Sequence, residues 1–184
     1  MGLYIIVGIA VVLLLITVIW FNLLIRHRNK VRNAWSDIDV QLKRRYSLIP
    51  NIVESVKGYA AYERGLLEDV TRSRALAMEA KSPGDQAVAE NLLTGALKGL
   101  FAVVENYPEL LANQNFMKLQ DTLIDVEENL QMARRYYNAV VRDNNTAVES
   151  FPGNVLARIF SFRTASFFEI DPIEKEVIKV NIKN

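Results

Sequence analysis

Apolar residues follow two different patterns along this chain, an unbroken block at the start and a periodic stripe after it. From Leu3 to Ile25 the sequence LYIIVGIAVVLLLITVIWFNLLI carries no charge. A helix needs roughly 20 apolar residues to cross a bilayer. From Trp35 onward apolar residues recur three and four positions apart, which is typical of one face of an amphipathic helix. The pattern therefore predicts a membrane-spanning helix followed by helices that pack on one another.

The first block has two other interpretations, a cleaved signal peptide and a buried core helix. A signal peptide has a basic start, a shorter apolar stretch and small residues at a cleavage site. Here no Lys or Arg precedes Leu3, and no A-x-A pattern follows Ile25. A core helix is seldom so uniformly apolar, and Tyr4, Trp20 and Phe21 suit the two interfacial zones of a bilayer. We expect a retained transmembrane helix over residues 3–25.

Basic side chains lie on only one side of this block, and the other side has only the amino terminus. Arg26, Arg28, Lys30 and Arg32 follow it closely. Lys and Arg beside a span stay on the cytoplasmic side. We therefore expect a single-pass protein of the cell membrane, with its N-terminus outside and the bulk of the chain in the cytoplasm. The four basic residues would contact anionic headgroups, at about 1 kcal/mol each, act as a stop-transfer signal, or do both.

The stripe that begins at Trp35 passes through Pro50, which raises the alternative of two helices joined at that proline. Proline inside a helix removes an N–H donor and costs ~3 kcal/mol. A new helix starting at Pro50 would need a capping residue before it, and Ile49 is a poor cap. The stripe also keeps its phase across the proline. It predicts one helix, kinked at Pro50, that continues from the span and runs to about Met78 despite two glycines.

Three proline-containing segments break the pattern farther along. They are KSPGD, ENYPEL and SFPGN, which begin at Lys81, Glu105 and Ser150. The stretches between and after them predict a helix over about 85–104 with Asp85 as its cap, a long helix over about 113–149, and a short amphipathic piece over 155–160. The final EVIKVNI alternates and is expected to be extended.

Long helices with short polar connections are typical of an antiparallel bundle. We predict an all-α fold in which a single transmembrane helix precedes an antiparallel bundle of three to four long helices. The expected parts are an extracytoplasmic N-terminus (1–2), the transmembrane helix (3–25), a basic juxtamembrane segment (26–34), a cytoplasmic helical bundle (35–170) and a C-terminal tail (171–184).

Composition limits the chemistry. The formal net charge of the 184-residue chain is +1, and it has no cysteine and one histidine. This charge gives no general attraction to nucleic acid, so we expect no nucleic-acid partner. Thiolate catalysis and cysteine-based metal sites are excluded, as is a di-iron bundle built on two Glu-x-x-His motifs. The chain also lacks a nucleophile–base pair with histidine or cysteine, which argues against a hydrolase or a lipid-modifying enzyme. We expect no enzyme, and no catalytic, metal or cofactor site.

Two groups of residues are candidates for an interaction surface. Arg44 and Arg45 lie in a charged stretch that could bind an anion or a partner, or could simply form ion pairs on a helix surface. The second group belongs to the aromatic segment near the C-terminus, which either plugs one end of the bundle or contacts a second subunit, a partner or lipid. Its members are Phe151, Arg158, Phe160, Phe162, Phe167 and Phe168.

Three blocks of the sequence resemble the LemA family. They are RNAWSDIDVQLKRRYSLIPNIVESVKGYAAYE at 32–63, LEDVTRSRA at 67–75, and YYNAVVRDNNTAVESFPGNVLARIFSFRTASFFE at 136–169. The resemblance implies a bacterial, membrane-anchored helical bundle, and it implies no catalytic residues. We expect a self-associating scaffold or interaction protein that contacts membrane lipid, further copies of itself and an unidentified protein partner. The alternative is a membrane-shaping or envelope-stress-related assembly.

Overall fold

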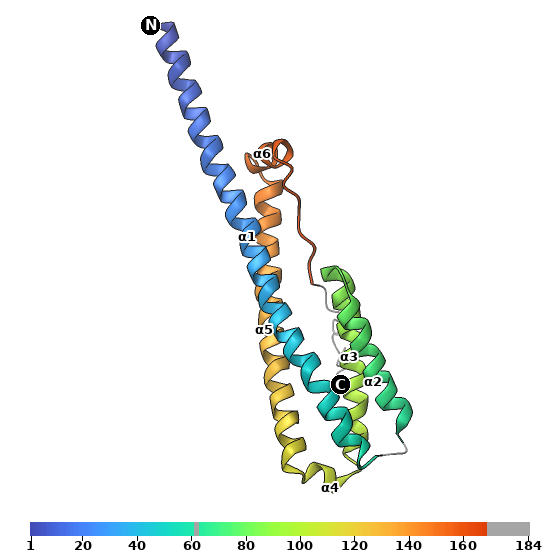
Figure 1. Ribbon diagram of the computed structural model, residues 1–184. Helices are drawn as coiled ribbons and strands as arrows, with labels where there is room; N and C mark the ends of the chain where they lie inside the picture. Colours follow the sequence, from blue (N-terminus) through green and yellow to red (C-terminus); the bar gives the residue numbers. More distant parts are fainter. Residues whose placement is uncertain (61–62, 169–184) are drawn as a thin grey trace, which may run out of the picture. The chain divides into compact units, whose positions relative to one another are not determined.

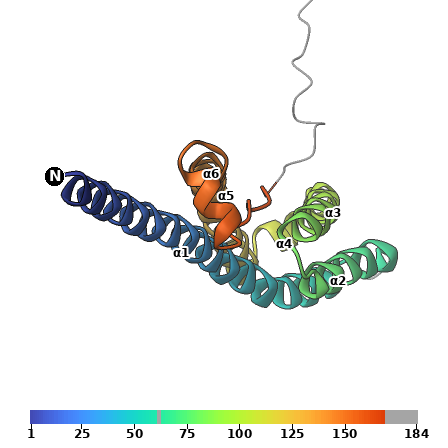
Figure 2. The same cartoon turned by 90° about the horizontal axis from the view of Figure 1, so that it is seen from above.

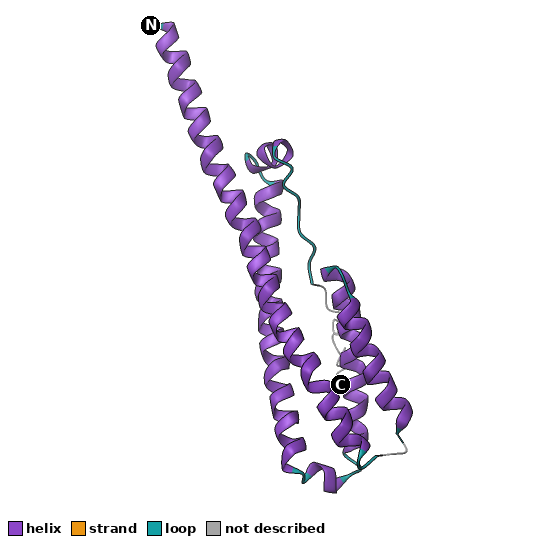
Figure 3. Ribbon diagram, viewed as in Figure 1, coloured by secondary structure: helices purple, strands orange, loops and turns teal. Residues whose placement is uncertain are grey.

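Helices make up most of the described part of the chain, as Figures 1 and 3 show. The structure is a computed structural model that describes residues 1–60 and 63–168. In chain order the helices are α1 (Gly2–Lys57), α2 (Arg64–Glu79), α3 (Pro83–Val104), α4 (Pro108–Leu111), α5 (Gln114–Glu149) and α6 (Gly153–Ile159). Within those two ranges no strand is found, so the all-α prediction is confirmed. The predicted extended tail lies outside the described residues.

The chain divides into two compact units, and the long helices α1 and α5 contribute to both. Unit 1 consists of Met1–Val40 and Leu130–Phe167, so it contains the start of α1, the end of α5 and α6. Unit 2 consists of the described residues within Gln41–Asn129 together with Phe168. It contains the end of α1, all of α2, α3 and α4, and the start of α5. Each unit has its own buried apolar residues.

Helix α1 is one uninterrupted helix from Gly2 to Lys57, with Pro50 inside it (Figure 1). The prediction of a single helix through Pro50, continuous with the apolar block, is therefore confirmed. Since proline has no N–H, the carbonyl of Tyr46, four residues earlier, loses its usual helical donor. The Arg74 Nε of α2 donates to that carbonyl instead, at 2.9 Å. A neighbouring helix thus uses the acceptor that the proline leaves open.

A double-mutant cycle tests this substitution of one donor for another. We expect Arg74→Ala to lower the free energy of unfolding by about 1–2 kcal/mol, since a charged group donates this hydrogen bond. In a Pro50→Ala background the restored N–H competes for the Tyr46 carbonyl, so the cost of Arg74→Ala falls by at least about half. Chemical denaturation of the four proteins measures both costs. Equal costs in the two backgrounds would contradict this account.

The first helix ends earlier than the sequence pattern predicts. It stops at Lys57, and α2 begins at Arg64, so the prediction of one helix to about Met78 is wrong. After Gly58 the backbone N–H groups of Tyr59 and Ala60 both turn back to the carbonyl of Val56, at 2.9 and 2.8 Å. Ala60 is fully buried. The turn after Gly58 buries Ala60 at a position that fits the three-and-four spacing. The apolar pattern therefore continues past the end of the helix.

The other helix boundaries agree with the prediction to within two residues, with one change of cap. Ser82, not Asp85, is the N-cap of α3: its Oγ accepts from the Asp85 N–H at 3.1 Å and donates to the Asp85 carboxylate at 2.7 Å. This reciprocal pair resembles a capping box. Asn113 caps α5 by accepting from the N–H groups of Asn115 and Phe116. The short α4 occupies the break around Pro108.

Helices α2 and α3 form a hairpin in unit 2 and lie side by side in both views (Figures 1 and 2). Only residues 80–82 separate them. Near the open end of the hairpin, a methyl group built on Gly99 would meet the Leu66 side chain at 3.3 Å. The absence of a Cβ at Gly99 lets the two helices approach closely, as expected for glycine at a helix contact.

Candidate functional site

The first part of α1 presents apolar side chains to its surroundings on every side. Leu3 is 71% exposed and Ile19 is 65% exposed, and none of the most apolar window of this helix is buried. An exposed apolar surface of this length is what a bilayer covers. Helix α3 also passes a test of length and composition for a span, but 39% of its apolar window is buried. We interpret α3 as a core helix of unit 2.

The four predicted membrane-surface residues lie on α1 directly after its apolar part. Arg26, Arg28, Lys30 and Arg32 are all exposed. The Arg28 guanidinium lies 5.1 Å from the centre of the Phe162 ring, which is a cation–π distance. The helix therefore changes from apolar to basic within two turns, as at the edge of a membrane span.

Helix α6 packs against α1 at this same change from apolar to basic. Leu24, Leu156 and Ala157 form a buried cluster, against which Trp20 and Phe162 pack. Next to this cluster, the Phe21 ring contacts the rings of Phe160 and Phe162 edge-on, with centroids 4.8 and 5.8 Å away. Aromatic pairs of this geometry contribute about 0.5–1.5 kcal/mol each beyond their buried area. The contacts fix α6 beside the end of the apolar block.

The segment after α6 is held against α5 by side chains of that helix. The Asn145 amide donates to the Ala165 carbonyl at 2.9 Å and accepts from the Ala165 N–H at 2.8 Å. The Tyr137 hydroxyl donates to the Ser166 carbonyl at 2.9 Å. These bonds satisfy a backbone that is neither helix nor strand. They also give Asn145, a polar residue late in the long helix, a structural role.

The aromatic segment is divided between buried and exposed side chains. Phe151 is 80% exposed, Phe160 46% and Phe167 38%, whereas Phe168 is 1% exposed and belongs to unit 2. Phe162 is half-buried against α1, and Arg158 is exposed. Some of the predicted surface residues thus plug a core, and others stand at the surface.

Of the two candidate arginines, Arg44 is exposed and Arg45 is buried. Arg45 is 1% exposed, and its guanidinium spans two helices of unit 2. It donates to the Glu90 carboxylate at 2.5 Å, to the Thr94 hydroxyl at 2.9 Å, and its Nε pairs with Glu127 at 2.6 Å. Arg45 therefore joins α1, α3 and α5 inside the unit rather than presenting its charge to a partner.

Tyr46 extends this buried polar network to α2. Its hydroxyl donates to the Glu90 carboxylate and accepts from the Gln86 side-chain amide, at 2.8 Å for the second bond. The same Gln86 nitrogen lies 2.9 Å from the Ala77 carbonyl at the end of α2. Sequence reasoning missed the network, although Gln86 and Glu90 interrupt the apolar face of α3 four residues apart. Such an interruption is the signal that could have revealed it.

Burial raises the pKa of Tyr46, and its hydrogen bond to Glu90 raises that pKa further. In an unfolded chain the tyrosine hydroxyl loses its proton at about pH 10. The contribution of Tyr46 to stability is therefore complete below that pH. The contribution decreases as the pH rises above about 10, because the unfolded chain then releases the tyrosine proton while the folded chain keeps it.

We expect the free energy of unfolding to fall above about pH 10, by up to about 1.4 kcal/mol per pH unit from this group. In Tyr46→Phe the alkaline slope should be shallower by that amount, although the variant is less stable at neutral pH because Glu90 and Gln86 lose a partner. Denaturation curves at a series of pH values measure the slope. An unchanged slope would show that Tyr46 ionises in the folded protein.

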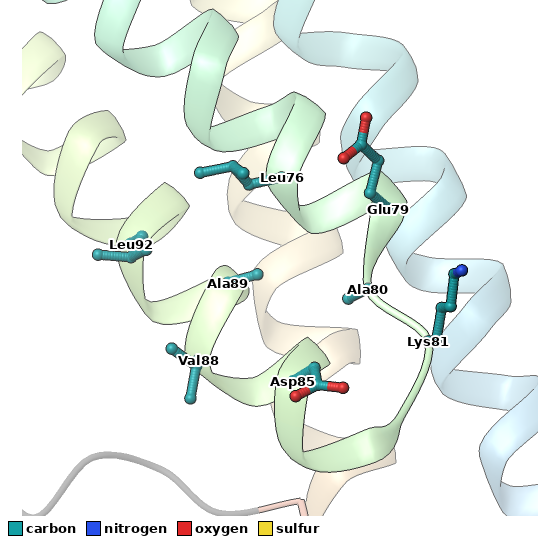
Figure 4. A pocket seen from close by; sticks show the side chains of 8 residues that line it. All are labelled: Leu76, Glu79, Ala80, Lys81, Asp85, Val88, Ala89 and Leu92. Atoms are coloured by element: carbon teal, nitrogen blue, oxygen red, sulfur yellow. The ribbon is translucent and has the colours of Figure 1, made fainter.

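A shallow groove lies on the α2–α3 hairpin near its connection. It has a volume of about 480 Å³ and is lined by Leu76, Glu79, Ala80, Lys81, Asp85, Val88, Ala89 and Leu92. Figure 4 shows Leu76 of α2 facing the apolar residues of α3, with the charged side chains gathered toward the connection. Leu76, Val88 and Leu92 are 48%, 64% and 55% exposed. The sequence signal for this surface is the presence of apolar residues outside the buried stripe of each helix.

Among the described residues, no group of three or more His, Cys, Asp or Glu side chains is placed to hold a metal ion. The buried carboxylate of Glu90 is already bonded to Arg45, Tyr46 and Gln86. These contacts give the network a structural role in unit 2.

Comparison with known proteins fits the helical structure. A family model described as the LemA family matches residues 34–182. This chain belongs to the LemA family. It is 25% identical to Protein LemA of Metamycoplasma hominis, over 84% of this chain and 71% of that protein.

This LemA-family chain is also similar to magnetosome proteins. It is 26% identical to magnetosome protein MamQ 2 of Paramagnetospirillum magneticum and 25% identical to MamQ of Magnetospirillum gryphiswaldense. In each case the match covers 74% of this chain but only 60% of the relative. None of these names is that of an enzyme. Together with the apolar α1, the similarity to these proteins indicates a membrane-associated protein.

Proposed function

We propose that this LemA-family protein is a self-associating membrane scaffold without catalytic activity. In this proposal residues 3–25 cross the cell membrane once, and the helical part is an antiparallel bundle on the cytoplasmic side. The observation that supports it most is the continuity of α1, which runs from exposed apolar surface into both compact units without a break.

Ring contacts and packing within unit 1 support the antiparallel arrangement. Trp20 and the Ala147–Val148 pair pack on the same buried cluster, while Trp35 meets Tyr137 with ring centroids 5.4 Å apart. Residue numbers rise along α1 as they fall along α5. Neighbouring helices in bundles with short connections have this relation.

The orientation is supported by the four exposed basic residues that follow the apolar part of α1. It is tested by placing an epitope tag at the C-terminus and adding protease outside intact cells. We expect the tag to survive until the membrane is permeabilised. Removal of the tag from intact cells would show that the C-terminus lies outside the cell. It would contradict the proposed orientation but not the proposed membrane anchor.

The groove on the α2–α3 hairpin is our candidate for the self-association surface, with a second copy of this chain as its occupant. Its apolar residues are flanked by both acidic and basic side chains, Glu79 and Asp85 against Lys81. A two-fold interface between identical copies uses the same patch on each copy, so that patch must supply both charges. A hairpin patch with mixed charges meets this requirement.

Self-association is tested with the full chain in mild detergent. We expect a dimer or larger assembly by light scattering, and we expect Leu92→Glu to shift it toward monomer. The matched control is Ile124→Glu, a residue of α5 that is 48% exposed outside the groove. A monomer at every concentration would contradict self-association. Loss of assembly in both variants would contradict the choice of the hairpin. Crosslinking in native membranes would then identify a different protein partner.

A second candidate function is the shaping of membranes. It is favoured by the exposed apolar residues of α6, which lie beside the end of the predicted span. Shallow insertion of apolar side chains is a known means of sensing or producing curvature. Reconstituted protein would then tubulate or shrink vesicles at high density, and unchanged vesicle shape would count against this function.

A further inference from the structure

We propose that α6 is a second membrane contact, whose exposed apolar residues enter the interfacial layer of the bilayer that α1 crosses. The proposal rests on the membrane anchoring proposed above and adds a specific lipid-binding element to it. The contacting residues are Phe151, Val155 and Ile159, together with the neighbouring Phe160. They are 80%, 50%, 65% and 46% exposed.

The depth of α6 follows from what its other side contacts. Leu156 and Ala157 of α6 are buried with Leu24 of α1, and Trp20 packs on the same cluster. A helix rises about 1.5 Å per residue, so Trp20 lies only about 8 Å along the axis from the end of the apolar block. Interfacial helices sink about 5–10 Å into the boundary between headgroups and acyl chains. The docked α6 therefore lies at the depth where such helices bind.

The exposed apolar residues within α6 share one side. Phe151, Val155 and Ile159 are spaced four apart, which places Val155 and Ile159 on one face of the helix, with Phe151 just before its first turn. The side chains that pack on α1 belong to Leu156, which lies beside this face, and to Ala157, which lies about 160° around the helix from it. This division into a protein-facing side and an exposed apolar side is what a helix lying on a membrane requires.

Charge around α6 suits an anionic lipid surface. Exposed Arg158 lies within the helix, and exposed Arg163 follows it. The exposed basic residues of α1 begin two residues after Leu24. Juxtamembrane cations gain about 1 kcal/mol each near anionic headgroups. The apolar surface of α6 is also adjacent to the apolar surface of α1, so one lipid phase covers both. These features favour lipid over a second copy of the chain as the occupant.

Single-cysteine labelling tests the proposal directly, since the chain has no cysteine of its own. The full-length Ile159→Cys variant carries an environment-sensitive fluorophore and is reconstituted in vesicles of phosphatidylethanolamine and phosphatidylglycerol. Quenching groups are attached to the lipid near the headgroup in one preparation and near the chain end in another. We expect a blue-shifted emission and a loss of intensity that is larger with the shallow quencher. Adding Val155→Asp should reduce that loss.

Two further labelled positions separate the possible outcomes. Leu92→Cys, an exposed apolar position of unit 2, should stay unquenched. Ile9→Cys, in the apolar part of α1, should be quenched more by the deep quencher. A quenched Ile9 site with an unquenched Ile159 site overturns the α6 proposal and leaves the anchor intact. An unquenched Ile9 site overturns the proposed function itself. A blue shift at position 159 that grows with protein density, without lipid quenching, shows that a second copy covers α6.

Discussion

Replacing Arg45 with Met is expected to lower the free energy of unfolding by about 3–5 kcal/mol, the cost of breaking a buried ion pair by removing one partner. The Arg45 guanidinium is 1% exposed, and the Glu90 carboxylate that it contacts is fully buried. Without Arg45 that carboxylate loses its cationic donor in a place that water does not reach. The Thr94 hydroxyl and the Glu127 carboxylate lose a partner as well. Chemical denaturation of the full chain in mild detergent, followed by circular dichroism, measures the loss.

The adjacent residue supplies the control. Arg44 is exposed on the same helix, so Arg44→Met should change stability by no more than about 0.5 kcal/mol. The double variant Arg45→Met with Glu90→Met should cost less than the two single variants added together, because it leaves no buried charge between them. Additive costs would mean that the two side chains act independently. A small effect of Arg45→Met alone would mean that water reaches Glu90.

Replacing Gly153 with Ala is expected to displace α6 from α1 and cost about 1–3 kcal/mol or more, as overpacking of a buried site does. A Cβ on Gly153 would lie 2.1 Å from the carbonyl oxygen of Ala147 and 3.4 Å from the Trp20 ring. The first contact is with backbone, so a side-chain rotation does not relieve it. We expect Trp20 emission to shift in a Trp35→Phe background and the segment after α5 to become more sensitive to protease.

Gly95 is the matched control for Gly153. It is exposed on α3, and a Cβ there would meet nothing within 4 Å. Gly95→Ala should therefore stabilise the helix, by up to about 1 kcal/mol. If Gly153→Ala left Trp20 emission and protease sensitivity unchanged, the close approach of α6 to α5 would be absent in solution. The proposed lipid contact of α6 would then lose its structural basis.

Arg45 and Gly153 serve different purposes within one chain. The network around Arg45 and Glu90 joins α1, α3 and α5, and Tyr46 with Gln86 joins it to α2. A buried network is satisfied only when its members are correctly aligned, so we infer that it fixes the register of the helices in unit 2. The contacts of α6 instead place a small apolar surface beside the predicted span. The buried network therefore stabilises unit 2, whereas α6 presents an apolar surface to the surroundings.

Local patterns in the sequence were sufficient for much of the fold. The apolar block, the three-and-four spacing and the proline-containing breaks predicted α1 through Pro50, α3 and α5 to within two residues, because periodicity and capping are local properties. The end of α1 was missed, because the turn after Gly58 buries Ala60 and so imitates a continuing helix. Asp85 was predicted as the N-cap of α3, whereas the N-cap is Ser82. The two residues are hydrogen-bonded partners at the start of that helix.

The sequence alone determined that this chain is helical, carries one long uncharged apolar block followed by basic residues, and belongs with the LemA family. These properties depend on residue types and short-range spacing. Tertiary structure decided which charged and aromatic side chains are buried. Arg44 and Arg45 are neighbours of similar chemistry, yet one is exposed and the other lies between carboxylates of two distant helices. Phe151 and Phe168 differ in the same way, since Phe151 is exposed and Phe168 is buried. Such differences arise from pairings across tens of residues, which no local pattern encodes.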